Sequence, residues 1–161
     1  MDDDAHYPPD LFARLYDAFA AEPAHIHCYR AHHMRLSSTG EIQNYKEWEW
    51  ETQHTGPSTL LFPTGHVGVL YPPGSLHPDV TNIALFQSLC PHADDVWLKA
   101  MALLAGSKVK KLPGKNRQLP TTRHSQKTSL SQSNVVGGGN DLQIRKVFAH
   151  YNLNALLQTQ I

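Results

Sequence analysis

Apolar side chains recur every three or four residues in three parts of the chain, and this spacing predicts three amphipathic helices. The first helix is expected after Asp10, the second from Asp94 and Asp95, and the third from Asn140 or Asp141. Each of these polar residues is placed to cap the helix beside it. The expected apolar stripes are Leu11, Phe12, Leu15, Ala18 and Phe19 in the first helix, Val96, Trp97, Ala100, Met101 and Leu104 in the second, and Ile144, Val147, Phe148 and Tyr151 in the third.

Strands are predicted where apolar residues alternate with polar ones or run continuously between turn residues. The predicted extended segments cover residues 25–36, 45–51, 67–71 and 109–112, and a short helix is predicted over 82–89. In the second extended segment Trp48 and Trp50 alternate with three glutamates, which places both indoles on one face. A half-buried strand with one wet face explains this alternation, and an aromatic platform for a sugar is the alternative.

The composition indicates one domain over residues 1–161. A chain of 161 residues with 40% hydrophobic residues is within the ordinary range for a single globular unit. The formal net charge is zero, which argues against nucleic acid or an anionic membrane surface as the main partner. Residues 107–133 contain no acid, and we expect them to begin with a short strand and then to form a flexible basic loop.

The cysteines, the histidines and the hydropathy bear on the cellular location of the protein and on metal binding. Cys28 and Cys90 are isolated thiols that suggest neither a zinc knuckle nor a disulfide framework, which favours the cytoplasm. No apolar run approaches the roughly 18 residues that a transmembrane segment needs, so membrane association would be peripheral to the inner membrane. The chain has eleven histidines but no HExxH motif, which leaves a histidine-rich metal-binding protein as the weakest hypothesis.

Two acidic clusters are the strongest candidates for chemistry. Asp2, Asp3 and Asp4 stand at the start of the sequence, and Asp94 and Asp95 precede the apolar stripe of the second helix. If the fold brings both clusters to one pocket, their carboxylates could bind a hard divalent cation and remove a proton. The alternative is a solvated terminus together with a simple helix cap.

Six blocks of the sequence resemble a group of bacterial glycosyltransferases with the GT-A fold, which are linked to surface polysaccharide synthesis. The blocks are DDDAHYPPDLFARLYDAF, IHCYRAH, YKEWEWE, FPTGHVGVLYPPGSLHPDV, ADDVWLKAMALLAGSKV and GGGND, in this order. The resemblance implies an α/β protein with a partial GT-A (nucleotide-diphospho-sugar transferase) fold, in which helices flank a mixed sheet. Because the first block is the DxD motif, we expect the Rossmann-like N-terminal half of such a fold to be missing.

The resemblance also implies roles for the two acidic clusters. In such enzymes a DxD motif holds a divalent metal on the diphosphate of the donor, and here it maps onto Asp2 and Asp4 as metal ligands. Mn²⁺ or Mg²⁺ is the implied cofactor, because carboxylates suit hard cations that neutralise a departing diphosphate. Asp95 is the implied general base for the acceptor hydroxyl, with Asp94 as its neighbour or an acceptor contact. A helix N-terminus beside this pair favours ionised carboxylates.

Further implied contacts surround the sugars and the phosphates. A glycine-rich turn would lie near the donor sugar or the acceptor, where side chains would intrude, although this chain has GHVG where a GVGG-like run is expected. The basic loop could close over phosphates. The residues implied for the sugars are Gly65, His66, Gly68, Trp97 and Trp48, and those implied for the nucleotide are Asp3, Lys110 and Lys111.

The expected function is therefore transfer of a sugar from a nucleotide-sugar donor to a saccharide acceptor. The alternative is a noncatalytic truncated remnant that binds a partner or a carbohydrate through Trp48, Trp50 and Trp97. Where the missing half of the fold should dock, an exposed sheet edge could produce an oligomer. With base and ribose contacts absent, the isolated chain is expected to bind sugar nucleotides weakly or not at all.

Overall fold

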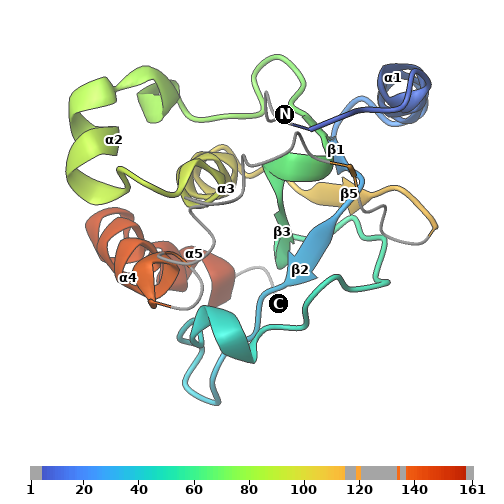
Figure 1. Cartoon of the computed structure of the whole chain (residues 1–161). Coiled ribbons are helices and arrows are strands. Elements are labelled where there is room, and N and C mark those ends of the chain that lie inside the picture. Colours follow the sequence, from blue (N-terminus) through green and yellow to red (C-terminus); the bar gives the residue numbers. More distant parts are fainter. Residues whose placement is uncertain (1–4, 115–118, 121–133, 135–136, 159–161) are drawn as a thin grey trace.

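Two small sheets form the centre of the protein, as the computed structural model in Figure 1 shows. In the first sheet β1 (Ile26–Cys28) lies between β4 (Val69–Leu70), which is antiparallel to it, and β5 (Val109–Lys111), which is parallel to it. The second sheet pairs β2 (Ala31–His33) with β3 (Leu61–Pro63) in antiparallel register. The structure describes residues 5–114, 119–120, 134 and 137–158.

Helices flank these sheets, so the protein is an α/β protein with a small mixed sheet. In Figure 1, α1 lies beside β1 and β5, whereas α2, α4 and α5 are grouped around α3 on the other side. No helix in the described ranges is both long and apolar enough to cross a bilayer. The helices are α1 (Leu11–Ala21), α2 (Ile83–Leu89), α3 (Asp94–Leu104), α4 (Gly139–Tyr151) and α5 (Leu153–Gln158), and the 3₁₀ helices are η1 (Tyr45–Glu47), η2 (Gly65–Val67) and η3 (Pro78–Thr81).

The largest core cluster forms around α3. Trp97 and Met101 of this helix pack with Phe62 of β3 and with the apolar stripe of α4. A smaller cluster lies between α3 and the β4–β1–β5 sheet, and a third joins α1 to η2. The α4 stripe in the first cluster consists of Ile144, Val147 and Phe148. Because α3 contributes to two of these clusters, its burial connects the helical side of the molecule to the sheet.

The three predicted amphipathic helices are confirmed, but none of the predicted polar residues caps its helix with a side-chain hydrogen bond. Asp10 is the N-cap of α1 without such a bond, and the N-cap of α3 is Ala93, so Asp94 and Asp95 lie in the first turn. At α4 the N-cap is Gly138, which has φ 73° and ψ 14°, and both Asn140 and Asp141 lie inside the helix. The glycine adopts the left-handed conformation at low cost, and the helix begins earlier than the polar residues suggested. Asp141 instead accepts a hydrogen bond from the backbone N–H of Tyr45 at 2.6 Å.

The extended segment predicted over residues 45–51 is wrong. Asn44 and Glu47 exchange side-chain and backbone hydrogen bonds in a capping box, which stabilises the N-terminus of the 3₁₀ helix η1. Such local hydrogen bonds compete with strand pairing. The chain then turns through Glu51, whose φ is 49°. The predicted strand over residues 25–36 is likewise divided into β1 and β2.

A buried lysine lies in the middle of α3. Lys99 is only 1% exposed, and its ammonium donates a hydrogen bond to the backbone oxygen of Thr59 at 2.7 Å. Burial lowers the pKa of the Lys99 ammonium from its ordinary value to about 7. The cost of removing the charge from water explains this direction. Burial of the charged ammonium therefore destabilises the native state relative to the unfolded chain near neutral pH.

This destabilisation predicts an unusual dependence of stability on pH. Between about pH 7 and pH 10, the unfolded chain holds a proton on Lys99 that the native state lacks, so stability rises with pH. The contribution of one such proton is at most about 1.4 kcal/mol per pH unit. We expect Lys99→Met to flatten the rise in the free energy of unfolding between about pH 7 and pH 9, as measured by urea denaturation. Lys108→Met, at an exposed lysine, is the control, and equal pH slopes for wild type and Lys99→Met would contradict the assignment.

Candidate functional site

Asp95 holds the turn that follows β3. Its Oδ1 atom accepts a hydrogen bond from the backbone N–H of Gly65 at 2.9 Å. A Cβ atom at position 65 would lie 3.0 Å from the same oxygen, so glycine lets the carboxylate approach the backbone closely. Asp94 and Asp95 both occupy the first turn of α3, where the helix dipole favours negative charge. The predicted acid pair is therefore at a helix N-terminus, against the predicted glycine turn.

The N-terminal segment contacts the same turn. The hydroxyl of Tyr7 donates a hydrogen bond to the backbone oxygen of His66 at 2.8 Å, across 59 positions of sequence. The ring of Tyr7 also packs against the cluster that contains Val67. Tyr7 and Asp95 thus hold neighbouring residues of η2. The predicted metal ligands Asp2 and Asp4, and Asp3 between them, lie outside the described residues.

The two other glycine-turn residues differ in exposure. His66 is partly exposed, whereas Gly68 is buried and has φ 107°. A Cβ atom at Gly68 would lie 3.2 Å from a methyl carbon of Leu11. The second glycine of GHVG is therefore explained by its backbone conformation and by packing against α1, and Gly65 is the one that faces the acid pair.

A row of polar side chains continues from this turn. Nε of Arg30 donates a hydrogen bond to Oγ1 of Thr64 at 2.7 Å, directly before Gly65. Nη1 of the same guanidinium lies 3.8 Å from a carboxylate oxygen of Glu51. Arg30 and Thr64 were not singled out from the sequence, because their relation to Asp95 depends on contacts across more than thirty residues.

The negative charge of Asp95 affects two tyrosine hydroxyls. The pKa values of Tyr45 and Tyr71 are both raised above the ordinary value, first by burial and then by the negative charge of Asp95. Both hydroxyls consequently stay protonated at neutral pH. Among these three groups, the carboxylate is the one able to accept a proton.

Both lysines predicted to contact the nucleotide are engaged with the protein. The ammonium of Lys110 is hydrogen-bonded to a carboxylate oxygen of Glu22, and this bond lowers the pKa of Glu22. Lys111 is buried, and its ammonium points to the backbone oxygens of Leu112 and Gly114 at 3.4 and 3.3 Å. These contacts explain the two lysines as parts of the fold of β5 and the segment after it.

The tryptophans fall into two groups. Trp48 and Trp97 are 4% and 3% exposed, and both belong to the largest core cluster. Their indole N–H groups donate to the backbone oxygens of Gln43 and Val80. The structure thus places both predicted sugar contacts in the core. Trp50 is 44% exposed.

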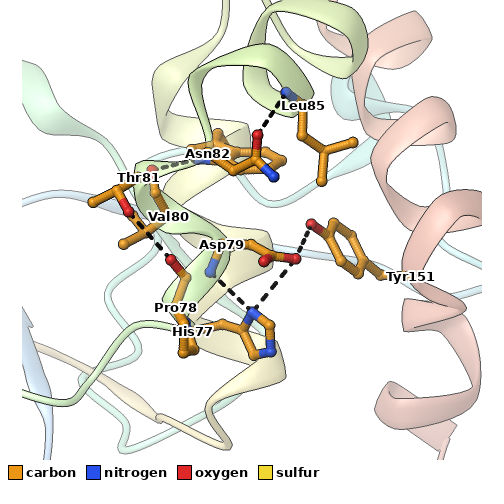
Figure 2. Close-up of polar contacts among 9 residues, drawn as sticks. His77, Pro78, Asp79, Val80, Thr81, Asn82, Leu85 and Tyr151 are labelled. Atoms are coloured by element: carbon orange, nitrogen blue, oxygen red, sulfur yellow. Dashed lines mark hydrogen bonds and ion pairs between the residues drawn. The ribbon is translucent and has the colours of Figure 1, made fainter.

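Hydrogen bonds of the LHPDV segment connect η3 to α4 (Figure 2). Nδ1 of His77 accepts the backbone N–H of Asp79 at 3.3 Å, which caps η3. The hydroxyl of Tyr151 donates to Oδ2 of Asp79 at 2.8 Å. Figure 2 also shows the side chain of Asn82 accepting the backbone N–H of Leu85 at the start of α2. These hydrogen bonds cap η3 and α2 and connect η3 to α4, which is a structural role.

The described part of the chain contains no group of three or more His, Cys, Asp or Glu side chains that could hold a metal ion. Cys28 and Cys90 are free, buried thiols, and burial raises the pKa of each to about 12. In comparisons with known proteins, the chain matches no family model, no curated protein and no solved structure.

The bond between Asp95 and Gly65 predicts a difference between two substitutions. Asp95→Ala leaves the Gly65 N–H without this acceptor and should lower the free energy of unfolding by about 1 kcal/mol, whereas Asp95→Asn retains an acceptor oxygen and should cost less. Denaturant unfolding measures both values. Asp94→Ala is the matched control, because it removes an exposed carboxylate from the same helical turn. An equal loss for Asp95→Ala and Asp94→Ala would contradict this role of Asp95.

Proposed function

We propose that this chain is the acceptor-side, catalytic part of a metal-dependent glycosyltransferase of the GT-A type, which transfers a sugar from a nucleotide-sugar donor to a saccharide hydroxyl. One observation carries the proposal. The three-residue turn η2 is bonded to Asp95 at Gly65 and to Tyr7 at His66, and Tyr7 follows the first acidic cluster closely in the sequence. This arrangement supports a site to which both acidic clusters contribute.

In this proposal Asp95 is the general base. An acceptor hydroxyl placed beside η2 would pass its proton to the carboxylate of Asp95 as its oxygen attacks the anomeric carbon of the donor. The Gly65 N–H and the N-terminus of α3 favour the negative carboxylate before the transfer. The protonated phenols of Tyr45 and Tyr71 do not compete for this proton.

The donor would be held by the first acidic cluster. Asp2 and Asp4 would provide carboxylate ligands for Mn²⁺ or Mg²⁺, a chemically suitable donor set for a hard cation. The bound ion would neutralise charge on the departing nucleoside diphosphate. The Tyr7 hydroxyl bond supports this role, because it fixes the residues that follow the cluster against the turn held by Asp95.

A noncatalytic carbohydrate-binding or partner-binding module is the second candidate. It is favoured by the exposed aromatic side chains, which are Trp50 and, on α1, Phe12 at 65% exposure and Tyr16. Such a module needs no base, so loss of the Asp95 charge would leave its binding unchanged. The two candidates are therefore separated by the same substitution.

The catalytic proposal predicts that Asp4→Asn and Asp95→Asn each abolish sugar transfer. Because a positioned general base contributes about 10²- to 10⁴-fold, we expect at least a hundredfold loss of kcat for Asp95→Asn. The measurement is transfer from a panel of sugar nucleotides with Mn²⁺, in the complete natural polypeptide. Asp17→Asn, which removes an exposed carboxylate from α1, should keep the wild-type rate. Near wild-type rates for both Asp4→Asn and Asp95→Asn would refute the catalytic assignment.

The proposal also predicts how these 161 residues behave alone. A GT-A enzyme binds the base and ribose through a Rossmann-like half that would precede the first acidic cluster. We therefore expect isothermal titration calorimetry to show weak or undetectable binding of sugar nucleotides to the chain, with or without Mn²⁺. Micromolar binding would contradict the assignment of this chain to the acceptor side.

A further inference from the structure

We propose that Trp50 is the ring on which a pyranose unit of the saccharide acceptor stacks. The inference rests on the proposed function, because it names the acceptor contact of the same site. The sequence pattern placed Trp48 and Trp50 on the same face of a predicted strand, and the structure differs. The fold separates them, since Trp48 is in the core and Trp50 keeps 44% of its surface exposed.

The indole of Trp50 is held in a fixed position although it is exposed. Its Nε1–H donates a hydrogen bond to the backbone oxygen of Tyr45 at 3.2 Å. Its ring centroid lies 4.9 Å from that of His32, with 36° between the planes, and 5.3 Å from that of Tyr45. The indole N–H is thus already satisfied, and the remaining atoms of the ring are apolar carbons. A sugar ring presents a C–H face to such a surface, where contact with the π-system is favourable.

The backbone that displays this ring is strained. Glu51, the next residue, has φ 49°, in the left-handed region that residues other than glycine seldom adopt. Its N–H donates a hydrogen bond to Nδ1 of His32 at 2.9 Å. This bond requires a neutral imidazole, and burial lowers the pKa of His32 to about 4, so the bond persists across the physiological pH range. Strained residues that the surrounding structure holds in place are concentrated at functional sites.

The residue that follows Trp50 belongs to a pair of charged side chains. The carboxylate of Glu51 and the guanidinium of Arg30 are 3.8 Å apart and both are partly exposed, offering an acceptor and donors for sugar hydroxyls. Arg30 is bonded to Thr64, and Gly65, the next residue, is bonded to Asp95. Trp50 is thus connected to the proposed base through its neighbour Glu51, the pair of Arg30 and Thr64, and Gly65. An acceptor of two or more sugar units could stack at Trp50 and present a hydroxyl to Asp95.

The exposed ring provides a direct binding measurement. Of the three tryptophans, only Trp50 is open to solvent, so acrylamide quenching of the intrinsic fluorescence reports on it. We expect disaccharides with glucose, galactose or N-acetylglucosamine units to reduce quenching in a saturable way, without donor or metal. Trp50→Ala should abolish binding of the same disaccharide in calorimetry, whereas Trp50→Phe should retain part of it. Leu142→Ala, which removes an exposed apolar side chain from α4, is the matched control and should bind normally.

The kinetic result separates this inference from the proposed function. In the complete natural polypeptide, Trp50→Ala should raise KM for the acceptor about tenfold or more, with a smaller change in kcat. An unchanged acceptor KM, or a full panel of disaccharides that leaves Trp50 equally quenched, would overturn the stacking role while leaving transfer intact. Conversely, shielding of Trp50 together with full activity of Asp95→Asn would uphold the sugar contact and refute the catalytic assignment.

Discussion

The burial of α3 is the constraint on which the rest of the structure depends. Most of this helix is buried, and it contacts β3, η3, α4 and α5. Its position fixes where its first turn points, and that turn carries Asp94 and Asp95. The carboxylate of Asp95 then determines where Gly65 lies, so the packing of the helical side of the molecule sets the geometry of the turn after β3. The cost of enclosing Lys99 in the same helix indicates how strongly the surrounding apolar contacts favour this arrangement.

The sequence predicts the elements whose pattern is local. The spacing of apolar residues gives the three long helices, because one face of each is buried against a core. It fails over residues 45–51, where alternation suggested a strand but the capping box of Asn44 and Glu47 closes a 3₁₀ helix instead. It also fails at the start of α4, since a glycine in the left-handed conformation replaces a side-chain cap. In each failure a local hydrogen bond or a backbone conformation outweighs the periodic signal.

The candidate site is less predictable than the fold, because its connections are distant in sequence. The acid pair and the glycine turn could be selected from the sequence, and Asp95 does contact Gly65 across 30 positions. The roles of Tyr7 and Arg30 depend on partners 59 and 34 positions away, which no local pattern reveals. The tryptophans illustrate the same limit. Trp50 is exposed and Trp48 is buried although only Glu49 lies between them, and alternation had placed both on one face.

The hydrogen bond from Tyr45 to Asp141 links the beginning of α4 to the turn that displays Trp50. The backbone oxygen of Tyr45 in turn accepts the indole N–H, so a residue near the end of the chain helps to orient a ring from its first third. During synthesis on a ribosome, residues 45–50 leave the exit tunnel long before residue 141. The bond from Tyr45 to Asp141 can form only after α4 has been synthesised and has docked, so the support of the proposed sugar contact depends on a helix residue 96 positions further along the chain.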